Sequence, residues 1–228
     1  MLYAITGRRL YSENKADALA SLVDLAAIWA TNGVSYIQLR EKDLSGREQV
    51  ELTRAVIRAV QHVGDEASVP KVLVNARVDV ALAASADGVH LPSGPDVLPP
   101  TEVRSIFAAA GDTRPPVISV SCHTIEEVMS ARQHSPDCIL FAPVFEKLIR
   151  EKDAALDKRE SCGGDAPRLP GTGLGLLEQA CRVAAPVPVF ALGGVTAENA
   201  ADCLRVGAVG IAAIRLLQES PSAWKHFA

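Results

Sequence analysis

Polar side chains follow several short apolar runs of this sequence, each at the point where a run ends. His123 comes just after one such run, and a histidine titrates near neutrality, so it can both accept and return a proton. Arg40 can bind a phosphate or a carboxylate with two parallel hydrogen bonds, and Lys42 can supply a mobile positive charge. The remaining polar residues at run ends are Gln38, Asn75, His90, Ser93, Ser119 and Ser121. These residue types predict proton transfer on an anionic small molecule, with His123 carrying the proton.

A pair of glycines, Gly193-Gly194, follows the apolar run at residues 187–191. Without Cβ atoms, the backbone N–H groups of such a pair can approach an anion closely. A helix is predicted to open with Thr196, and the next apolar run, residues 210–214, leads directly into another helix whose N-terminus carries a partial positive charge. We therefore predict a phosphate site formed by Gly193, Gly194 and the backbone near Ala213.

Each of these residues also has a structural interpretation. A glycine pair after a strand is often only a tight turn. Arg40 and Lys42 flank Glu41, and the three could form a solvated cluster of ion pairs. His123 precedes a predicted helix that opens at Thr124, so it could be a capping or merely exposed histidine.

Short apolar runs alternate with longer amphipathic segments along the whole chain. The predicted strands are residues 2–5, 34–39, 71–74, 88–90, 117–120, 138–141, 187–191 and 210–214. The predicted helices include residues 15–31, 47–62, 78–84, 101–110, 124–133 and 174–183. Eight strands, each followed by a helix, predict an α/β fold of the (β/α)8 TIM-barrel type, with a doubly wound open sheet as the alternative. In a barrel, the polar residues above would meet at the C-terminal ends of the strands.

One connection is much longer than the others. Residues 146–171 are rich in charged residues, glycine and proline, and they are nearly free of large apolar side chains. Loops of this length are lids or solvated insertions, and their position on the catalytic face favours a lid. We expect one TIM-barrel domain over residues 1–228, with this loop after the sixth strand.

Composition argues against two classes of partner. Lysine and arginine total 23 against 27 acidic residues, so the basic footprint of a nucleic-acid-binding protein is missing. No apolar stretch approaches the ~18 residues that a spanning helix needs, and the N-terminus lacks the pattern of a signal peptide. We therefore expect a cytoplasmic protein. The five cysteines are odd in number and lack CxxC spacing, which favours buried thiols over disulfides or a zinc site.

Six segments, in order along the chain, match the motifs of one group of proteins. They are Tyr36-Ile-Gln-Leu-Arg-Glu-Lys42, Asn75-Ala-Arg-Val-Asp-Val-Ala-Leu82, Gly88-Val-His-Leu91, Ser119-Val-Ser-Cys-His123, Ala142-Pro-Val-Phe145 and Ala191-Leu-Gly-Gly-Val195. The chain resembles the thiamine phosphate synthase and TenI superfamily over nearly its whole length. The resemblance implies a TIM barrel that binds the thiazole phosphate of the thiamine pathway, with the phosphate on the Gly193-Gly194 loop and the backbone near Ala213.

The resemblance leaves two branches open. Synthases join hydroxymethylpyrimidine pyrophosphate to the thiazole phosphate with Mg²⁺, and their pattern has Asn-Asp where this chain has Asn75-Ala76. Their Gly-Gln pair after Leu91 and their Thr-x-Thr-Lys run after Phe145 are also replaced. These departures resemble the TenI branch, whose catalytic histidine matches His123 with a displacement of one residue.

His90 and the intact Arg40-Glu41-Lys42 look synthase-like and keep that branch as the alternative. The TenI resemblance implies a thiazole tautomerase, which aromatises a carboxythiazole phosphate by proton transfer at His123 without a cofactor; a synthase would require Mg²⁺. A non-catalytic thiazole-phosphate-binding regulator is the second alternative. The substrate-binding residues expected are Gln38, Arg40, Lys42, Asn75, His90, Ser93, Ser121, Gly193, Gly194 and Ala213, with no metal ligands. Thiazole synthase as a pathway neighbour and a homodimer are left open as partners.

Overall fold

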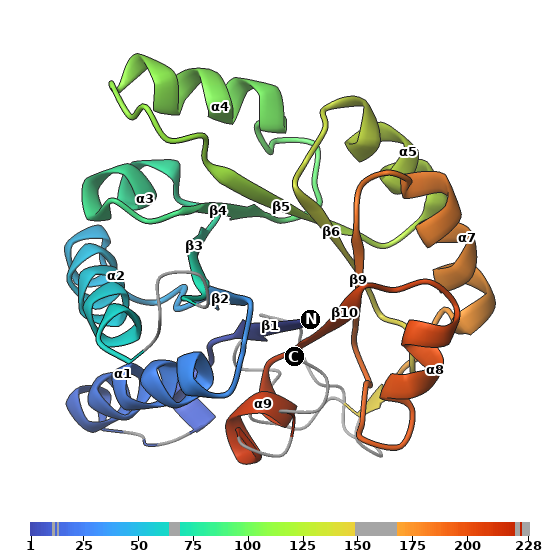
Figure 1. The fold of residues 1–228 in the computed structure, drawn as a ribbon, viewed down its shortest axis with the longest axis horizontal. Helices are drawn as coiled ribbons and strands as arrows, with labels where there is room; N and C mark the ends of the chain where they lie inside the picture. The colour runs from blue at the N-terminus through green and yellow to red at the C-terminus, as the bar shows by residue number, and fades with distance from the viewer. Residues whose placement is uncertain (11, 13, 64–68, 149–167, 222–223, 225–228) are drawn as a thin grey trace.

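Eight parallel strands close into a barrel in the computed structural model, which describes all residues except 11, 13, 64–68, 149–167, 222–223 and 225–228. The pairing order is β1-β10-β9-β6-β5-β4-β3-β2, so β1 lies between β2 and β10 (Figure 1). The barrel strands are β1 (Leu2–Ile5), β2 (Tyr36–Leu39), β3 (Lys71–Asn75), β4 (Gly88–Leu91), β5 (Val117–Cys122), β6 (Cys138–Phe141), β9 (Val189–Leu192) and β10 (Gly210–Ala213). Closure confirms the predicted (β/α)8 barrel and excludes the open sheet.

Helices surround the barrel in chain order (Figure 1). They are η1 (Arg8–Leu10), α1 (Lys15–Thr31), α2 (Gly46–Gln61), α3 (Val78–Ala84), α4 (Pro100–Ala109), α5 (Ile125–Gln133), α7 (Leu174–Ala184), α8 (Ala200–Arg205) and α9 (Arg215–Glu219). Side chains define where several of them begin. Ser45 and Glu48 form a reciprocal capping box at the start of α2. The Thr124 side chain accepts the Glu127 N–H at the start of α5.

The core has two layers, because alternate side chains of each strand point to opposite faces of the sheet. Tyr3, Leu140 and Phe190 are fully buried together with other residues of the barrel interior. Larger clusters fill the space between the strands and the helices, where Trp29 of α1 is fully buried and donates from its indole N–H to the Leu217 carbonyl at 2.8 Å. This bond ties α1 to α9, the short helix that follows the last strand.

Most boundaries lie within two residues of those expected, and two of the differences bear on residues of interest. β5 continues to Cys122 and therefore contains Ser121. The helix expected to open at Thr196 begins instead at Ala200. The Asn199 side chain bonds within the preceding turn, since its Oδ1 accepts the Thr196 N–H at 2.8 Å and its Nδ2 donates to the Gly194 carbonyl at 3.1 Å. The Ala200 N–H donates to the Thr196 carbonyl, so a single helical turn precedes α8.

The connection expected at residues 146–171 contains two short strands outside the barrel. β7 (Lys147–Leu148) pairs in antiparallel fashion with β8 (Arg168–Leu169), and β6 pairs directly with β9. Residues 149–167 between them lie outside the described part of the chain, and so does most of the loop interpreted as a lid.

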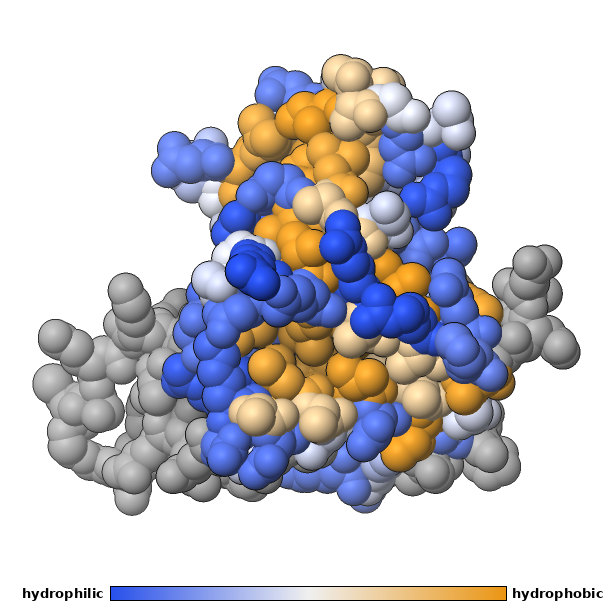
Figure 2. Space-filling view, turned by 90° about the vertical axis from the view of Figure 1, so that its left-hand side faces the viewer, coloured by the Kyte–Doolittle hydropathy of each residue, from blue (hydrophilic) through white to orange (hydrophobic). Residues whose placement is uncertain are grey.

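The face that carries α1 to α4 has apolar patches between charged side chains (Figure 2). Exposed large apolar residues of α1, α4 and the segment after α2 include Ile28, Ile106 and Val63. Among the described residues, no helix is long and apolar enough to cross a membrane. Cys122, Cys138 and Cys203 are buried thiols and Cys181 is partly buried, all four free.

Candidate functional site

A cavity of about 790 Å³ lies at the C-terminal ends of the barrel strands. Most of the polar residues expected there from the sequence line it: Gln38, Arg40, Lys42, Asn75, His90, Ser93, Ser121 and His123. Ser119 does not, because it lies within β5 and is fully buried in the barrel. They come from the ends of β2, β3, β4 and β5 and from the loops that follow. The fold therefore brings residues separated by up to 85 positions, from Gln38 to His123, around a single space.

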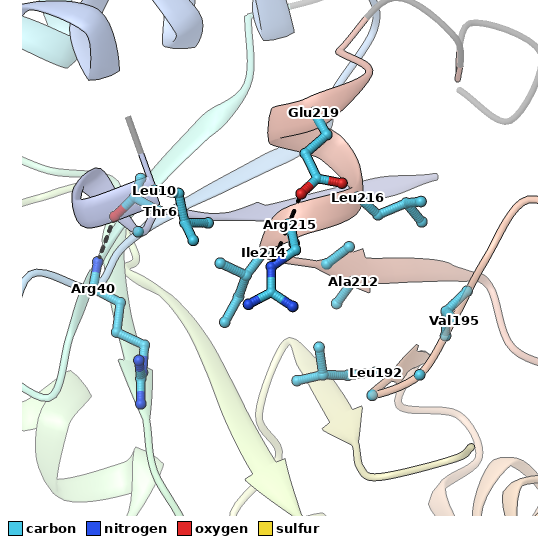
Figure 3. Close-up of a pocket in the computed structure, with 14 residues that line it drawn as sticks. Thr6, Leu10, Arg40, Leu192, Val195, Ala212, Ile214, Arg215, Leu216 and Glu219 are labelled. Carbon is cyan, nitrogen blue, oxygen red and sulfur yellow. Dashed lines mark hydrogen bonds and ion pairs between the residues drawn. The ribbon is translucent and has the colours of Figure 1, made fainter. Parts of the chain in front are cut away.

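A second cavity of about 310 Å³ adjoins the first and contains the predicted phosphate-binding residues Gly193, Gly194 and Ala213. Arg40, Leu192, Gly193 and Ile214 line both cavities. In Figure 3, Thr6 and Arg40 lie on one side, Leu192 and Val195 lie on the other, and Ile214 and Arg215 lie between them. The two cavities therefore lie side by side, with these four residues as their shared wall.

The glycine pair is required by its surroundings as well as by its backbone angles. Gly193 and Gly194 have φ values of 90° and 66°, in the left-handed region that favours glycine. A Cβ atom on Gly193 would lie 2.8 Å from Pro143 Cα, and one on Gly194 would lie 2.7 Å from Phe145 Cβ. The pair thus lets the loop after β9 pack tightly on the loop after β6 while lining the smaller cavity.

Arg40 is positioned through its backbone, whose N–H donates to the Thr6 hydroxyl at 2.9 Å. Its guanidinium borders both cavities, and no acidic side chain in the described residues pairs with it. The interpretation of Arg40, Glu41 and Lys42 as one solvated ion-pair cluster is wrong, because Glu41 is buried and pairs with Arg8 instead. Arg40 is therefore a partly buried cation suited to an anionic ligand.

Arg8, which follows β1, is a residue that the sequence analysis missed. It is only 5% exposed, and its guanidinium contacts Glu41 and forms two hydrogen bonds to Asp43. The Arg8 backbone N–H also donates to Glu41 Oε1 at 3.1 Å. Burial raises the pKa of Glu41, although hydrogen bonds from Thr6 and Arg8 oppose this. The network fixes the loop that carries Arg40 and Lys42. The signal in the sequence was an arginine three positions after the end of a predicted strand.

His123 is exposed, and its ring is oriented by a hydrogen bond of 2.7 Å between Nδ1 and the Ala142 carbonyl. A carbonyl oxygen can only accept, so Nδ1 carries the proton and Nε2 of the neutral ring carries the lone pair. The Glu127 carboxylate accepts from the His123 backbone N–H and, at 2.7 Å, from the Ser93 hydroxyl. Burial acts to raise the pKa of Glu127, but these hydrogen bonds outweigh it and the pKa lies below its usual range. Glu127 thereby joins the loops after β4 and β5.

His90 lies deeper, 3% exposed, with a hydroxyl group on each ring nitrogen. Nδ1 lies 2.9 Å from Ser119 Oγ, and Nε2 lies 2.9 Å from Ser121 Oγ. Burial, followed by the positive charge of Arg40, lowers the pKa of His90 to about 3. His90 is therefore neutral near pH 7 and contributes hydrogen bonds rather than charge to the cavity.

Gln38 and Asn75 form a pair on neighbouring strands, in which Gln38 Nε2 donates to Asn75 Oδ1 at 2.9 Å. The other amide atom, Gln38 Oε1, is buried and has no hydrogen-bond partner in the described structure. An unsatisfied buried acceptor costs free energy until a donor reaches it. Gln38 thus lines the larger cavity with a buried acceptor that the described residues leave unsatisfied.

A synthase would need Mg²⁺, and the described residues around the cavity do not by themselves supply its usual carboxylate ligands. Among these described residues, Glu41 is the single carboxylate that lines the larger cavity, and its oxygens already accept hydrogen bonds from Arg8. The position after Asn75 is Ala76, whose φ is 60°. In the described parts of the chain, no group of three or more His, Cys, Asp or Glu side chains could hold a metal ion.

Comparison with known proteins identifies the family. The family model for thiamine monophosphate synthase matches residues 2–159. The chain belongs to the thiamine monophosphate synthase family. A relative in Aquifex aeolicus, described as a putative thiamine-phosphate synthase 2, is 32% identical over 218 residues, covering 96% of this chain and 97% of the relative. A thiamine-phosphate synthase of Methanoculleus marisnigri is 36% identical over 193 residues, covering 84% and 77%.

A solved structure extends this family relationship to the fold. The thiamine phosphate pyrophosphorylase from Pyrococcus furiosus is similar with a TM-score of 0.71 and 26% identity, covering 99% of this chain and 90% of that one. These relatives confirm the family expected from the six motifs. At the level of the reaction, their names support the synthase alternative better than the tautomerase interpretation.

Proposed function

We propose that this protein binds a thiazole phosphate and catalyses proton transfer on it, the reaction of a thiazole tautomerase. The observation that carries the proposal is the orientation of His123, whose Nδ1–H is held by the Ala142 carbonyl at 2.7 Å while the ring lines the larger cavity. This arrangement leaves Nε2 as a base.

The proposed reaction moves one proton and changes nothing else in the composition of the substrate. His123 Nε2 takes the proton from the ring carbon that bears the carboxylate, and the electron pair of that C–H bond enters the ring. The exocyclic double bond then takes the same proton from the imidazolium, which aromatises the ring. The Ala142 carbonyl holds the imidazole ring of His123 in place through both steps. Arg40 binds the carboxylate, and the backbone at Gly193, Gly194 and Ala213 binds the phosphate.

A thiamine phosphate synthase is the second candidate, and a different observation favours it. The unsatisfied Gln38 Oε1 would accept a hydrogen bond from the amino group of a hydroxymethylpyrimidine pyrophosphate. Two adjoining cavities of about 790 and 310 Å³ would also hold two substrates. The names of the relatives support this candidate.

One experiment on the purified protein separates the candidates. Its first arm supplies the exocyclic carboxythiazole phosphate and follows aromatisation by ultraviolet absorbance. Its second arm supplies hydroxymethylpyrimidine pyrophosphate, thiazole phosphate and Mg²⁺ and measures thiamine phosphate. Rapid turnover in the first arm alone supports the tautomerase, and thiamine phosphate formation at a synthase-like rate refutes it. Binding without turnover in either arm would support the non-catalytic regulator.

A further inference from the structure

A chain of hydrogen bonds crosses the barrel interior and ends at the larger cavity. The Tyr3 hydroxyl of β1 lies 2.8 Å from Ser119 Oγ of β5, which lies 2.9 Å from His90 Nδ1. His90 Nε2 lies 2.9 Å from Ser121 Oγ. Tyr3 and Ser119 are fully buried, whereas Ser121 lines the cavity. The row of hydrogen bonds therefore begins at a buried hydroxyl in the core and ends at a hydroxyl that lines the larger cavity.

The numbers of donors and acceptors determine which group donates in each of these hydrogen bonds. The His90 ring is neutral, so one of its nitrogens donates and the other accepts. Tyr3 keeps its proton, because burial raises its pKa well above the usual value. Its hydroxyl has Ser119 as its single hydrogen-bond partner in the described structure. If Ser119 donated to Tyr3, the Tyr3 O–H would have no acceptor, at the cost of an unmade buried hydrogen bond.

The direction that satisfies every buried hydroxyl begins at Tyr3. Tyr3 O–H donates to Ser119 Oγ, Ser119 O–H donates to His90 Nδ1, and His90 Nε2–H donates to Ser121 Oγ. The opposite tautomer of His90 would leave either Tyr3 or Ser119 with a buried O–H and no acceptor. In the described structure, the Ser121 hydroxyl proton has no protein acceptor.

We propose that Ser119 is a positioning residue that holds His90 in its Nε2–H tautomer and so makes Ser121 a hydrogen-bond donor to the ligand. The ligand group facing Ser121 is then an acceptor, such as a carboxylate oxygen or a ring nitrogen without hydrogen. The identity of that ligand rests on the proposed function, whereas the tautomer of His90 does not.

The tautomer is measured directly by long-range ¹H–¹⁵N correlation spectra of the histidine rings in the ligand-free protein, with His90→Gln to assign the His90 signals. We expect His90 to be the Nε2–H tautomer from pH 5.5 to 8. Tyr3→Phe should leave the tautomer unchanged, because Ser119 still needs an acceptor. Ser119→Ala should let both tautomers populate, because no buried hydroxyl then requires Nδ1 as its acceptor.

Tyr36→Phe is the matched control, since Tyr36 stacks on Tyr3 at 5.4 Å but does not belong to the chain. If Ser119→Ala does not fold, the double variant Tyr3→Phe/Ser119→Ala removes both buried hydroxyls together and leaves neither unpaired. An Nδ1–H signal for His90 in the unmodified protein would overturn the proposal, as would a pure Nε2–H signal in both variants that lack Ser119.

Ligand binding provides the second readout, with carboxythiazole phosphate as the probe in calorimetry. Loss of one hydrogen bond from Ser121→Ala should weaken binding by about three- to tenfold. Ser119→Ala should weaken it less, because Ser121 can still donate in part of the population. If Ser121→Ala binds the probe with unchanged affinity while His90 shows the expected tautomer, the role of Ser121 as a donor is refuted and the tautomer assignment stands. Absence of probe binding to the unmodified protein would refute the proposed function and leave the tautomer result standing.

Discussion

The Arg8 guanidinium donates two parallel hydrogen bonds to the Asp43 carboxylate, one of 3.0 Å from Nη1 to Oδ1 and one of 2.7 Å from Nη2 to Oδ2. This fork joins the segment after β1 to the segment after β2. Arg40 and Lys42 lie between the strand end and Asp43, so their positions depend on a residue that does not itself line either cavity.

Arg8→Ala should lower the free energy of unfolding by about 3 kcal/mol, because it leaves Glu41 buried without its cation. It should also raise the KM for the phosphate ligand, because the loop that carries Arg40 loses its anchor. Urea unfolding and steady-state kinetics check both effects. Arg9→Ala is the control: Arg9 pairs with the same Asp43 but is about half exposed, so a change under about 1 kcal/mol is expected. Equal effects of the two substitutions would contradict this role of Arg8.

His123→Ala should slow tautomerisation by about 10²- to 10⁴-fold and change ligand affinity only a few-fold, because it removes proton transfer but not the phosphate anchor. Single-turnover absorbance and calorimetry measure the two quantities separately. His62→Ala, at the exposed end of α2, is the matched histidine control and should retain full activity. Normal turnover in His123→Ala would exclude His123 as the base.

The smaller cavity can be tested as a phosphate site with a charge-matched pair at Val195. Val195→Asp and Val195→Asn add side chains of similar size, but only the first puts a negative charge beside the expected phosphate. We expect the Asp variant to bind the thiazole phosphate at least about tenfold more weakly than the Asn variant. Substituting Gly194 would not isolate the charge, because any Cβ there would lie 2.7 Å from the Glu146 carbonyl oxygen. Equal affinities would place the phosphate elsewhere.

The low pKa of His90 predicts an acid-sensitive fold. The unfolded chain binds a proton near pH 6.5, whereas the folded chain resists it until pH falls to about 3. The stability that neutral His90 contributes is therefore complete above pH 6.5 and is lost as pH falls from 6.5 toward 3. Between pH 5.5 and 4, the free energy of unfolding should fall by up to about 1.4 kcal/mol per pH unit more in the unmodified protein than in His90→Gln. Parallel slopes would mean that His90 is already protonated in the folded state.

Ala76→Asp restores the carboxylate that the synthase pattern has at this position. Its backbone suits the change, because φ is 60° and Asp tolerates this region better than Ala. We expect the variant to fold and to make little more thiamine phosphate than the unmodified protein, because Glu41 remains committed to Arg8 and one carboxylate does not complete a Mg²⁺ site. A large gain in Mg²⁺-dependent thiamine phosphate formation would favour the synthase candidate.

Local pattern explains which parts of the fold were predictable. The strands were found because each is a short apolar run between turn residues, and parallel pairing then required His90, Ser121 and His123 to meet at one end. The start of α8 at Ala200 differs from the predicted start at Thr196, and residues 196–199 form a turn in which the Asn199 side chain bonds to Thr196 and Gly194. Apolar spacing does not reveal such side-chain bonds.

Long-range partners could not be predicted in the same way. Glu41 lies between two basic residues in the sequence, a pattern that predicts a solvent-exposed ion-pair cluster. Its partner in the structure is instead Arg8, from a different loop. Tyr3 and Ser119 each lie within an apolar run of the sequence, which does not predict a polar partner. They are 116 positions apart and share a hydrogen bond across the barrel. Only barrel closure, with β1 opposite β5, brings these hydroxyls together.

The place of β1 between β2 and β10 also constrains how the protein is made. As the chain leaves the ribosome, β1 can pair early with β2, but its other edge stays open until β10 has emerged. Met1 and Val209, joined by a hydrogen bond in the finished barrel, are 208 positions apart. Contacts this distant form slowly, and an open strand edge in the meantime invites pairing with another chain. We expect nascent chains that stop before residue 210 to need chaperone protection, and folding to complete only after the last strand is released.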